Sequence, residues 1–233
     1  KDGYIPITMP DEFAFFTNTQ LETYTLAQGT VQEISGTLDG NQHWSNDYLY
    51  QVTGELYLNE GDTLVINPGV EIQFMGEYTF MVDGKLHANG TEQDSILFPS
   101  GMPITSTNDW NTIFLSDNSD GSHLNYTIVE YANHGIELNN SDGTIVNQST
   151  FRYNHYGVKS SYSNAIISGS AFYQNHRGIF LYLDQSEDQC VISNNQIYDN
   201  ANGIYATQSG GIIEGNEIYN NLTYDICFSS IDA

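Results

Sequence analysis

Residues 190–209 read CVISNNQIYDNANGIYATQS, and residues 211–230 read GIIEGNEIYNNLTYDICFSS, which repeats the same apolar, Asn and Gly positions. Two earlier copies are TIVNQSTFRYNHYGVKSSYS at 144–163 and AIISGSAFYQNHRGIFLYLDQSED at 165–188, and residues 122–142 form a looser one. The four clear copies begin 21, 25 and 21 residues apart. Self-similarity at such a period is typical of a solenoid built from stacked repeats.

Three apolar columns recur in these copies, each within a short alternating segment rich in β-branched and aromatic residues. Such segments predict strands, and we expect the columns to face a common core. The columns are Ile145, Ile166, Val191 and Ile212; Ile128, Phe151, Phe172, Ile197 and Ile218; and Ile136, Val158, Ile179, Ile204 and Ile226. Glycine precedes the third column at Gly135, Gly157, Gly178 and Gly203. A glycine there suits a sharp corner of the backbone.

Three short strands per copy favour a coil over hairpins or helical repeats. No Asn-Gly or Asp-Gly turn recurs between paired strands, and no copy has a helical pattern. We therefore predict an all-β parallel β-helix with three strands and about 22 residues per coil. Each strand would pair with its equivalent ~4.8 Å away, so like side chains stack. This predicts two polar ladders, Asn154–Asn175–Asn200–Asn221 and Ser149–Ser170–Asn195–Asn216.

The first half of the sequence has a compatible strand pattern, with wider spacing between the strands. It contains DTLVINPGVEIQF at 62–74, VDGKLHANGTEQDSILF at 82–98 and WNTIFL at 110–115. These stretches resemble the N-terminal coils of the pectin-lyase-like superfamily. The Asn-x-Ile-x-x-Asn…Gly-Ile copies resemble its carbohydrate-binding and sugar-hydrolase type repeats. The resemblance covers residues 31–230 and implies a right-handed parallel β-helix. It selects no function, because lyases, hydrolases, epimerases, tailspikes and adhesins share this fold.

The two ends of the chain do not follow the repeat in the same way. Residues 1–30 lack it and hold Phe13, Phe15 and Phe16, so we expect an N-terminal cap or an arm that pairs with another molecule. Residues 31–233 would form the β-helix. No cap is evident after the last copy. We therefore expect either continuation in a longer chain or end-to-end assembly with a second copy.

The composition of the chain disfavours several classes of binding partner. The 233 residues include 5 Lys plus Arg against 29 Asp plus Glu, for a formal charge of −24. This charge disfavours nucleic acid and anionic membrane surfaces as partners. No apolar run approaches the ~18 residues of a membrane helix, so we expect no membrane insertion. The Lys-poor, Asn-, Ser-, Thr- and Tyr-rich composition favours an extracellular or cell-surface location.

Histidines recur near one corner of the predicted coils, in the pairs Asn133-His134, Asn154-His155 and Asn175-His176. Side chains ~5 Å apart on adjacent coils can share a proton or a metal. The candidate catalytic residues are therefore His134, His155, His176 and Arg177. A solvated corner is the alternative, because Ala201 and Leu222 take this position in later copies.

A tyrosine follows the second column in three successive copies. Strand alternation would turn these side chains outward, and aromatic rings with hydroxyl tips are suited to sugars. The candidate glycan-binding residues are Tyr173, Tyr198 and Tyr219, with Arg152 preceding them. Phe180 and Tyr205, which follow the third column, are also expected to face out. Ordinary cross-strand packing of tyrosine is the alternative.

Two acidic corners and two cysteines complete the candidates. Asp117, Asp120 and Asp142 could supply carboxylate ligands to Ca²⁺, the one cofactor we consider, although neither segment matches an EF-hand loop. Solvated turn acids are the alternative. Cys190 and Cys227 align with different segments of adjacent coils, so we expect unbridged, buried cysteines.

Three functions follow from these features. The leading one is a secreted or cell-surface, non-catalytic module that binds a neutral glycan, as a polysaccharide or on a cell surface, or serves as a structural or adhesive element. It is favoured because the Asn-Thr-Asp, Asp-Asp and Gly-His-Gly motifs of polygalacturonases are absent. The second is a carbohydrate-active enzyme, a polysaccharide lyase or hydrolase, that uses the histidine row. The third is a self-assembling filament or surface-layer subunit.

Overall fold

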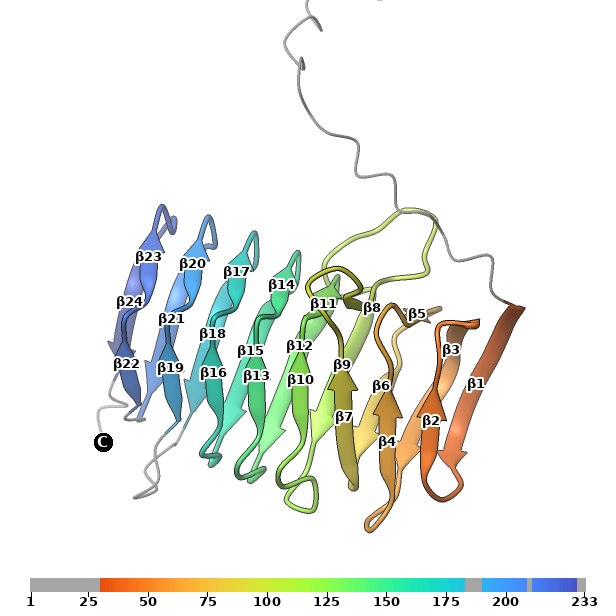
Figure 1. Ribbon diagram of the computed structural model, residues 1–233. Helices are drawn as coiled ribbons and strands as arrows, with labels where there is room; N and C mark the ends of the chain where they lie inside the picture. Colours follow the sequence, from red (N-terminus) through yellow and green to blue (C-terminus); the bar gives the residue numbers. More distant parts are fainter. Residues whose placement is uncertain (1–29, 183–189, 209–210, 230–233) are drawn as a thin grey trace, which may run out of the picture.

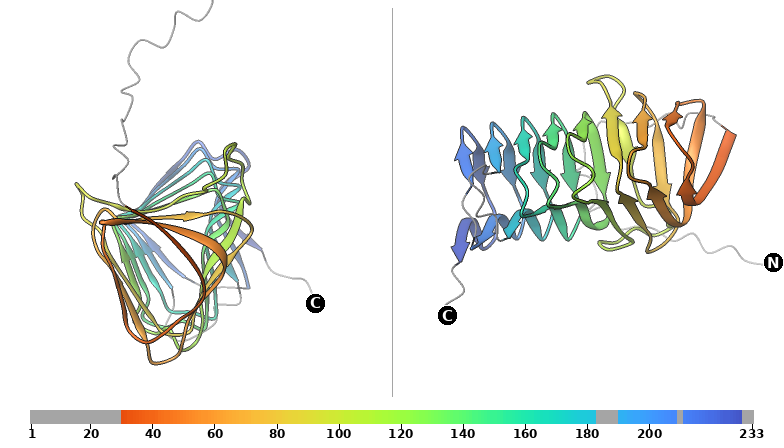
Figure 2. Two further views of the ribbon diagram at one scale, coloured as in Figure 1. Left: turned by 90° about the vertical axis from the view of Figure 1, so that its right-hand side faces the viewer. Right: turned by 90° about the horizontal axis from the view of Figure 1, so that it is seen from below.

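The computed structural model describes residues 30–182, 190–208 and 211–229, and it folds them into strands and turns with no helix in these ranges. The predicted N-terminal cap lies outside the described residues, apart from Thr30. From β4 onward the strands come in threes, and each strand pairs in parallel with its equivalents in the coils before and after it. The coils stack along one axis and, seen down that axis, outline a three-sided solenoid (Figures 1 and 2). The predicted right-handed parallel β-helix is confirmed.

The first face is a sheet of eight strands. Its strands are β2 (Gln42–Trp44), β4 (Thr63–Ile66), β7 (Lys85–Asn89), β10 (His123–Asn125), β13 (Ile145–Asn147), β16 (Ile166–Ser168), β19 (Val191–Ser193) and β22 (Ile212–Glu214).

The second and third faces join into one sheet of sixteen strands, because the long β3 (Tyr48–Leu58) pairs with both β5 and β6, and β1 (Thr30–Leu38) pairs with β3. The second face consists of β5 (Glu71–Phe74), β8 (Ile96–Phe98), β11 (Thr127–Glu130), β14 (Thr150–Arg152), β17 (Ala171–Tyr173), β20 (Gln196–Tyr198) and β23 (Glu217–Tyr219). The third face consists of β6 (Thr79–Val82), β9 (Trp110–Leu115), β12 (Ala132–Asn139), β15 (Tyr156–Ser161), β18 (Arg177–Tyr182), β21 (Asn202–Thr207) and β24 (Tyr224–Ser229).

The core is a stack of inward-facing aliphatic and aromatic side chains. Two of the predicted columns contribute to it, but the second begins at Val129, which pairs with Phe151, and the predicted Ile128 points outward. The first predicted column is wrong as a core column: Ile145, Ile166 and Ile212 are 40%, 41% and 46% exposed. The residues that follow Ile145, Ile166 and Val191, namely Val146, Ile167 and Ile192, fill the core instead.

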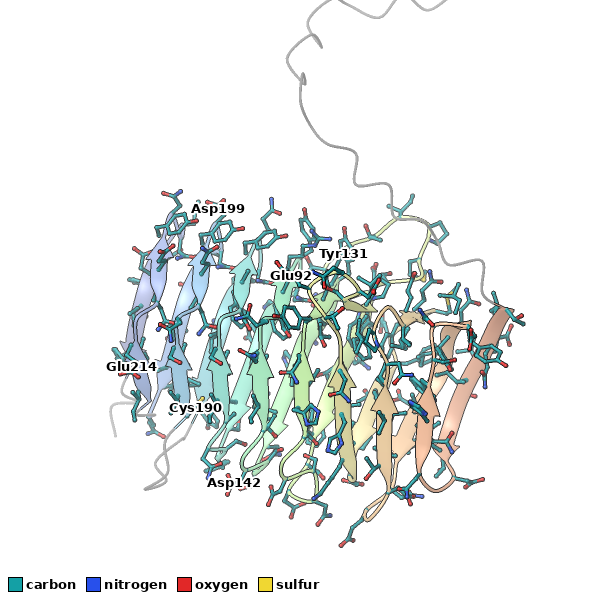
Figure 3. All side chains as sticks on the ribbon, viewed as in Figure 1. Glu92, Tyr131, Asp142, Cys190, Asp199 and Glu214 are labelled. Atoms are coloured by element: carbon teal, nitrogen blue, oxygen red, sulfur yellow. The ribbon has the colours of Figure 1, made fainter. Side chains whose placement is uncertain are left out.

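The corners are made by residues with a left-handed backbone conformation, not by the predicted glycines. The corner between the second and third faces uses Tyr131, Tyr153, Gln174, Asp199 and Asn220, whose φ values lie between 53° and 64°. Tyr131 and Asp199 mark this long edge of the solenoid, and Asp142 lies along the opposite edge (Figure 3). Gly157 and its equivalents lie inside third-face strands without positive φ. A Cβ on Gly157 would come within 2.5 Å of the Gly178 carbonyl oxygen, so glycine serves the close approach of successive coils.

Both predicted polar ladders are confirmed. In the corner between the second and third faces, the Asn175 amide nitrogen donates to Asn200 Oδ1 at 3.0 Å and to the Phe151 carbonyl at 2.9 Å. Its Oδ1 accepts the backbone N–H of Asn154 at 2.9 Å. The second ladder repeats this pattern from Ser149 to Asn216. The ladders satisfy buried backbone groups at the turns, where the strand hydrogen bonds end.

The two cysteines are unbridged, as predicted. Cys190 is buried in the core, but Cys227 is only half-buried. It pairs with Tyr205 in an outward row of the third face, so the prediction of two core cysteines is wrong for Cys227.

Candidate functional site

The predicted tyrosine ladder lies on the second face. Tyr173, Tyr198 and Tyr219 pair in successive strands, and Arg152 precedes them in the same outward row. The ring centroids are 5.1 and 5.2 Å apart, with interplanar angles of 12° and 4°. The ring faces therefore cover one another, and the ladder presents ring edges and hydroxyls to solvent. This differs from a platform on which sugars stack flat.

The Tyr198 hydroxyl stays neutral. Burial, followed by the neighbouring Tyr173 and Tyr219, raises the pKa of Tyr198 above its ordinary value. Arg152 Nη1 donates to the Tyr173 hydroxyl at 3.0 Å. A row of tyrosine hydroxyls can donate to and accept from the hydroxyls of a sugar.

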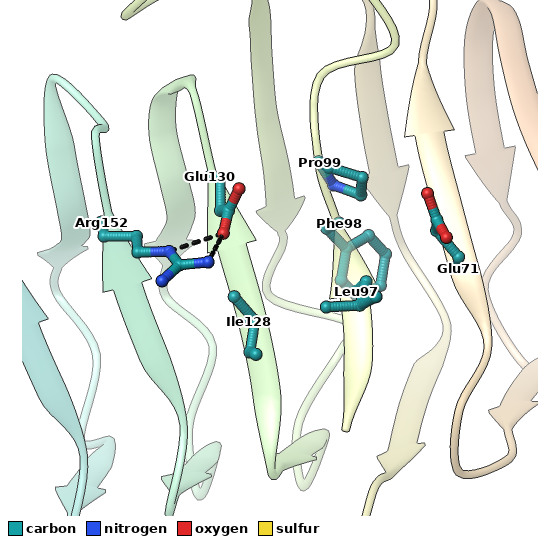
Figure 4. A pocket seen from close by; sticks show the side chains of 7 residues that line it. All are labelled: Glu71, Leu97, Phe98, Pro99, Ile128, Glu130 and Arg152. Carbon is teal, nitrogen blue, oxygen red and sulfur yellow. Dashed lines mark hydrogen bonds and ion pairs between the residues drawn. The ribbon is translucent and has the colours of Figure 1, made fainter. Parts of the chain in front are cut away.

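A pocket of about 150 Å³ opens on the second face at the N-terminal end of this ladder (Figure 4). Leu97, Pro99 and Ile128 give it an apolar floor, and Glu71 lies on one side. On the other side the Arg152 Nε donates to Glu130 Oε1 at 2.6 Å. An apolar floor with a few fixed polar groups at its rim is typical of small-molecule and sugar sites.

The predicted histidine row is only partly brought together. His155 and His176 are neighbours at the corner, with ring centroids 4.9 Å apart. His134 lies one position further along and pairs with Tyr156, whose ring it stacks on at 5.0 Å. The side chain of Asn133 takes the place opposite His155, at 3.2 Å from its Nδ1.

A charged cluster surrounds His134 on the third face. Its Nδ1–H donates to Glu137 Oε2 at 2.8 Å, and Lys159 Nζ donates to Glu137 Oε1 at 2.7 Å. Burial of Glu137 acts to raise its pKa, but the hydrogen bonds from His134 and Lys159 outweigh burial and lower the pKa below its ordinary value. Glu137 is therefore an ionised carboxylate that orients a histidine, an arrangement that suits general acid–base chemistry.

Arg177 lies beside this cluster among aromatic rings. Its guanidinium carbon is 5.1 Å from the Tyr156 ring centroid, 4.8 Å from that of Phe180 and 4.3 Å from that of Tyr205. Nη1 donates to the Tyr156 hydroxyl at 3.3 Å, and the buried Nε has no hydrogen-bond partner. The ion pairs of the described chain join His134, Lys159 and Arg152 to glutamates, and none includes Arg177.

His155 is uncharged at neutral pH. Burial is the largest cause that lowers its pKa, followed by the charges of His176, His134 and Arg177. A neutral imidazole next to Arg177 adds no positive charge to this corner, so the guanidinium is the unbalanced cation there.

Several side chains of these sites escaped sequence reasoning. Glu137, Tyr156 and Lys159 on the third face, and Glu71 and Leu97 in the pocket, were not singled out. The signal for the first three was available: aligning the copies on the glycine of each third strand, rather than on the Asn-His pairs, places His134 opposite Tyr156. Phe180 and Tyr205 face outward as expected.

Two of the acidic corner residues, Asp120 and Asp142, accept hydrogen bonds from the backbone of the following coil. Asp120 Oδ1 accepts the backbone N–H of Asp142 at 2.7 Å, and Asp142 Oδ1 accepts that of Asn164 at 3.1 Å. Within the described ranges, no group of three or more His, Cys, Asp or Glu side chains is placed to hold a metal ion. The calcium site predicted at Asp117, Asp120 and Asp142 gains no support from this arrangement.

Comparison with known proteins places the chain in a family. One solved structure, the A-module of the mannuronan C-5 epimerase AlgE6 from Azotobacter vinelandii, is similar with 12% identity and a TM-score of 0.38, over 87% of this chain and 72% of that one. No curated protein matches the sequence. No helix in the described part could cross a membrane. The family model for the periplasmic copper-binding protein NosD matches residues 79–232. The periplasmic description of this family is consistent with the predicted extracellular or cell-surface location, and the chain belongs to the NosD family.

Proposed function

We propose that this protein is a non-catalytic β-helix module, located outside the cytoplasm, that binds a neutral glycan along its second face. The observation that carries the proposal is the continuity of the pocket with the tyrosine ladder. Arg152 joins the two, because it lines the pocket and donates to the Tyr173 hydroxyl.

The two parts of this surface suit different parts of a sugar chain. The floor of Leu97, Pro99 and Ile128 suits the apolar face of one sugar ring. The tyrosine hydroxyls then repeat along the axis about every 5 Å, at the ring spacing, a repeat comparable with the length of one sugar unit. The formal charge of −24 favours a neutral chain over a polyanion.

A glycan array tests this proposal, run with and without Ca²⁺ beside assays for reducing sugars and unsaturated uronides on the same polysaccharides. We expect binding without turnover. Ile128→Trp should fill the pocket and abolish binding. Ile166→Trp, at an outward isoleucine on the first face, is the control and should bind like the wild type. Equal binding by both variants would remove the pocket from the proposal.

A carbohydrate-active enzyme, either a polysaccharide lyase or a hydrolase, is the second candidate. The hydrogen bond between His134 and Glu137, beside Tyr156 and Lys159, favours it. Turnover in either assay, lost in His134→Ala and kept in His87→Ala, would support this candidate over the first. His155→Ala and His176→Ala then test whether the corner pair contributes. If the protein shows neither binding nor turnover, self-assembly is the remaining candidate. Sedimentation of concentrated protein would detect it.

Copper, which the family description names, is not part of this proposal. Imidazole and thiolate are its usual protein ligands. The rings of His87 and His123 stack at 4.3 Å with an angle of 19°, so their in-plane nitrogens point side by side and do not converge on one ion. Cys190 is buried, and the described residues contain no three-ligand group. These residues do not fit a copper site.

A further inference from the structure

Arg177 differs from the other half-buried cations of this protein. Arg152 pairs with Glu130 and Lys159 pairs with Glu137, each across one coil. Arg177 has no carboxylate within ion-pair distance in the described part of the chain. The sequence carries 29 Asp and Glu against 5 Lys and Arg, so a missing partner here does not reflect a shortage of acids.

The surroundings of Arg177 hold its guanidinium in place without neutralising it. Tyr156 on the preceding coil and Tyr205 on the following coil approach it, and Phe180 lies further along its own strand. These rings stabilise the cation by cation–π contacts and exclude water from part of it. One hydrogen bond, to the Tyr156 hydroxyl, uses one of its five N–H donors. A preorganised, partly desolvated guanidinium with unused donors is a receptor for a planar anion.

We infer that Arg177, with Tyr156, Phe180 and Tyr205, forms a binding site on the third face for a single carboxylate carried on a body with an apolar face, such as one uronic acid unit. A monoanion is indicated because one unbalanced cation is present and the neighbouring His155 is neutral. Lys159 and His134 already donate hydrogen bonds to Glu137. The overall charge of −24 opposes polyanions, so the ligand carries isolated carboxylates. This site is independent of the second-face pocket and does not rest on the proposed neutral glycan.

Titration of the whole chain with sodium galacturonate, followed by NMR at constant ionic strength and pH 7.5, tests the inference. The Arg177 Nε–H signal, identified by its loss in Arg177→Gln, should shift with a millimolar dissociation constant. Galactose, the neutral match, should cause no shift. A shift with galactose of equal size, or no shift with galacturonate, would overturn the inference.

Variants separate the guanidinium from the general charge of the protein. Arg177→Gln should weaken galacturonate binding at least tenfold, and Arg177→Lys should recover only part of it, because lysine lacks the planar fork. Lys85→Gln, which removes one exposed cation on the first face, should bind within twofold of the wild type. A loss in Lys85→Gln equal to that in Arg177→Gln would show a nonspecific charge effect and contradict the site. Circular dichroism melting checks that each variant is folded.

A parallel titration with acetate distinguishes the sources of the carboxylate. Binding at least fivefold weaker than galacturonate would support recognition of the sugar body by the rings. Equal binding would confirm a carboxylate site but assign it to small organic acids, and it would remove the uronic acid from the inference.

Discussion

The second and third faces of the solenoid share one backbone and meet at one corner. Each carries a similarly placed arginine, but the partners of the two arginines differ. On the second face Arg152 is paired with Glu130, and the surface beyond it is a row of stacked tyrosines. On the third face Arg177 lies between aromatic rings without a carboxylate, beside Glu137, which already pairs with Lys159. Stacking of similar side chains on successive coils constrains which residues occupy the inward-facing rows. The outward-facing rows are free to vary. Chemistry that differs between faces therefore lies in the outward rows.

The largest expected effect comes from the corner that both faces share. Asn175→Ala removes the acceptor of the Asn154 backbone N–H and the donor to the Phe151 carbonyl, both buried. Each buried group left unsatisfied costs about 1–3 kcal/mol, so we expect a loss of about 3 kcal/mol or more in the free energy of unfolding, measured in urea. Asn202→Ala, an outward asparagine of the third face, should cost less than about 0.5 kcal/mol. Equal losses would contradict a structural role for the inner ladder.

The two arginines should differ in their effect on stability. Arg152→Gln leaves the partly buried Glu130 without its hydrogen-bonding partner, and we expect a loss of about 1–3 kcal/mol. Arg177→Gln removes a charge that no carboxylate balances, and it loses the ring contacts, worth about 0.5–1 kcal/mol, and one 3.3 Å hydrogen bond to the Tyr156 hydroxyl. Urea unfolding of both variants measures this order. A larger loss in Arg177→Gln would indicate that Arg177 is primarily a structural residue.

The tyrosine hydroxyls should contribute to neutral glycan binding but not to stability. Tyr198→Phe keeps the stacked ring and removes one hydrogen-bonding group, worth about 0.5–1.5 kcal/mol, so affinity should fall roughly 3- to 10-fold. The control is Tyr57→Phe, an exposed tyrosine of β3, whose affinity should match the wild type. Calorimetric titration with the best glycan of the array measures both. An unchanged affinity in Tyr198→Phe would exclude the hydroxyl row from the contact.

The smallest effect concerns pH and uses the first face as a reference. Burial lowers the pKa of His87 and His123, with Lys85 adding to the first and His87 to the second. The unfolded chain then binds more protons below about pH 6.5, so the contribution of these histidines to stability falls as the pH falls. Relative to the His87→Gln/His123→Gln variant, wild-type stability should drop between pH 7.5 and 5.5. Carboxylate protonation acts on both proteins alike, so a constant difference would contradict the assigned shifts.

Sequence periodicity predicted the parts of this fold that depend on like residues stacking. The asparagine ladder is an example, because an amide at a fixed position in successive copies can bond to itself along the axis. The direction of the first column could not be predicted, since both Ile145 and Val146, and both Ile166 and Ile167, are apolar. Alternation gives no sign of which residue faces inward when both members of a pair are aliphatic.

The candidate sites were harder to predict for a related reason. Outward residues come together across coils, so an error of one residue in register changes every neighbour of a side chain. Alignment on the Asn-His pairs placed His134 beside His155, whereas the backbone pairs His134 with Tyr156. The pocket at Leu97 and Ile128 depends on the wider N-terminal coils, which lack the clear repeat.

We expect the second and third faces of the solenoid to bind different ligands independently. The most direct test is a calorimetric titration of galacturonate into protein already saturated with the neutral glycan identified on the array. We expect the galacturonate dissociation constant to change less than twofold, because the pocket and Arg177 lie on different faces. Competition between the two ligands, seen as a galacturonate affinity that falls in proportion to glycan concentration, would contradict the claim.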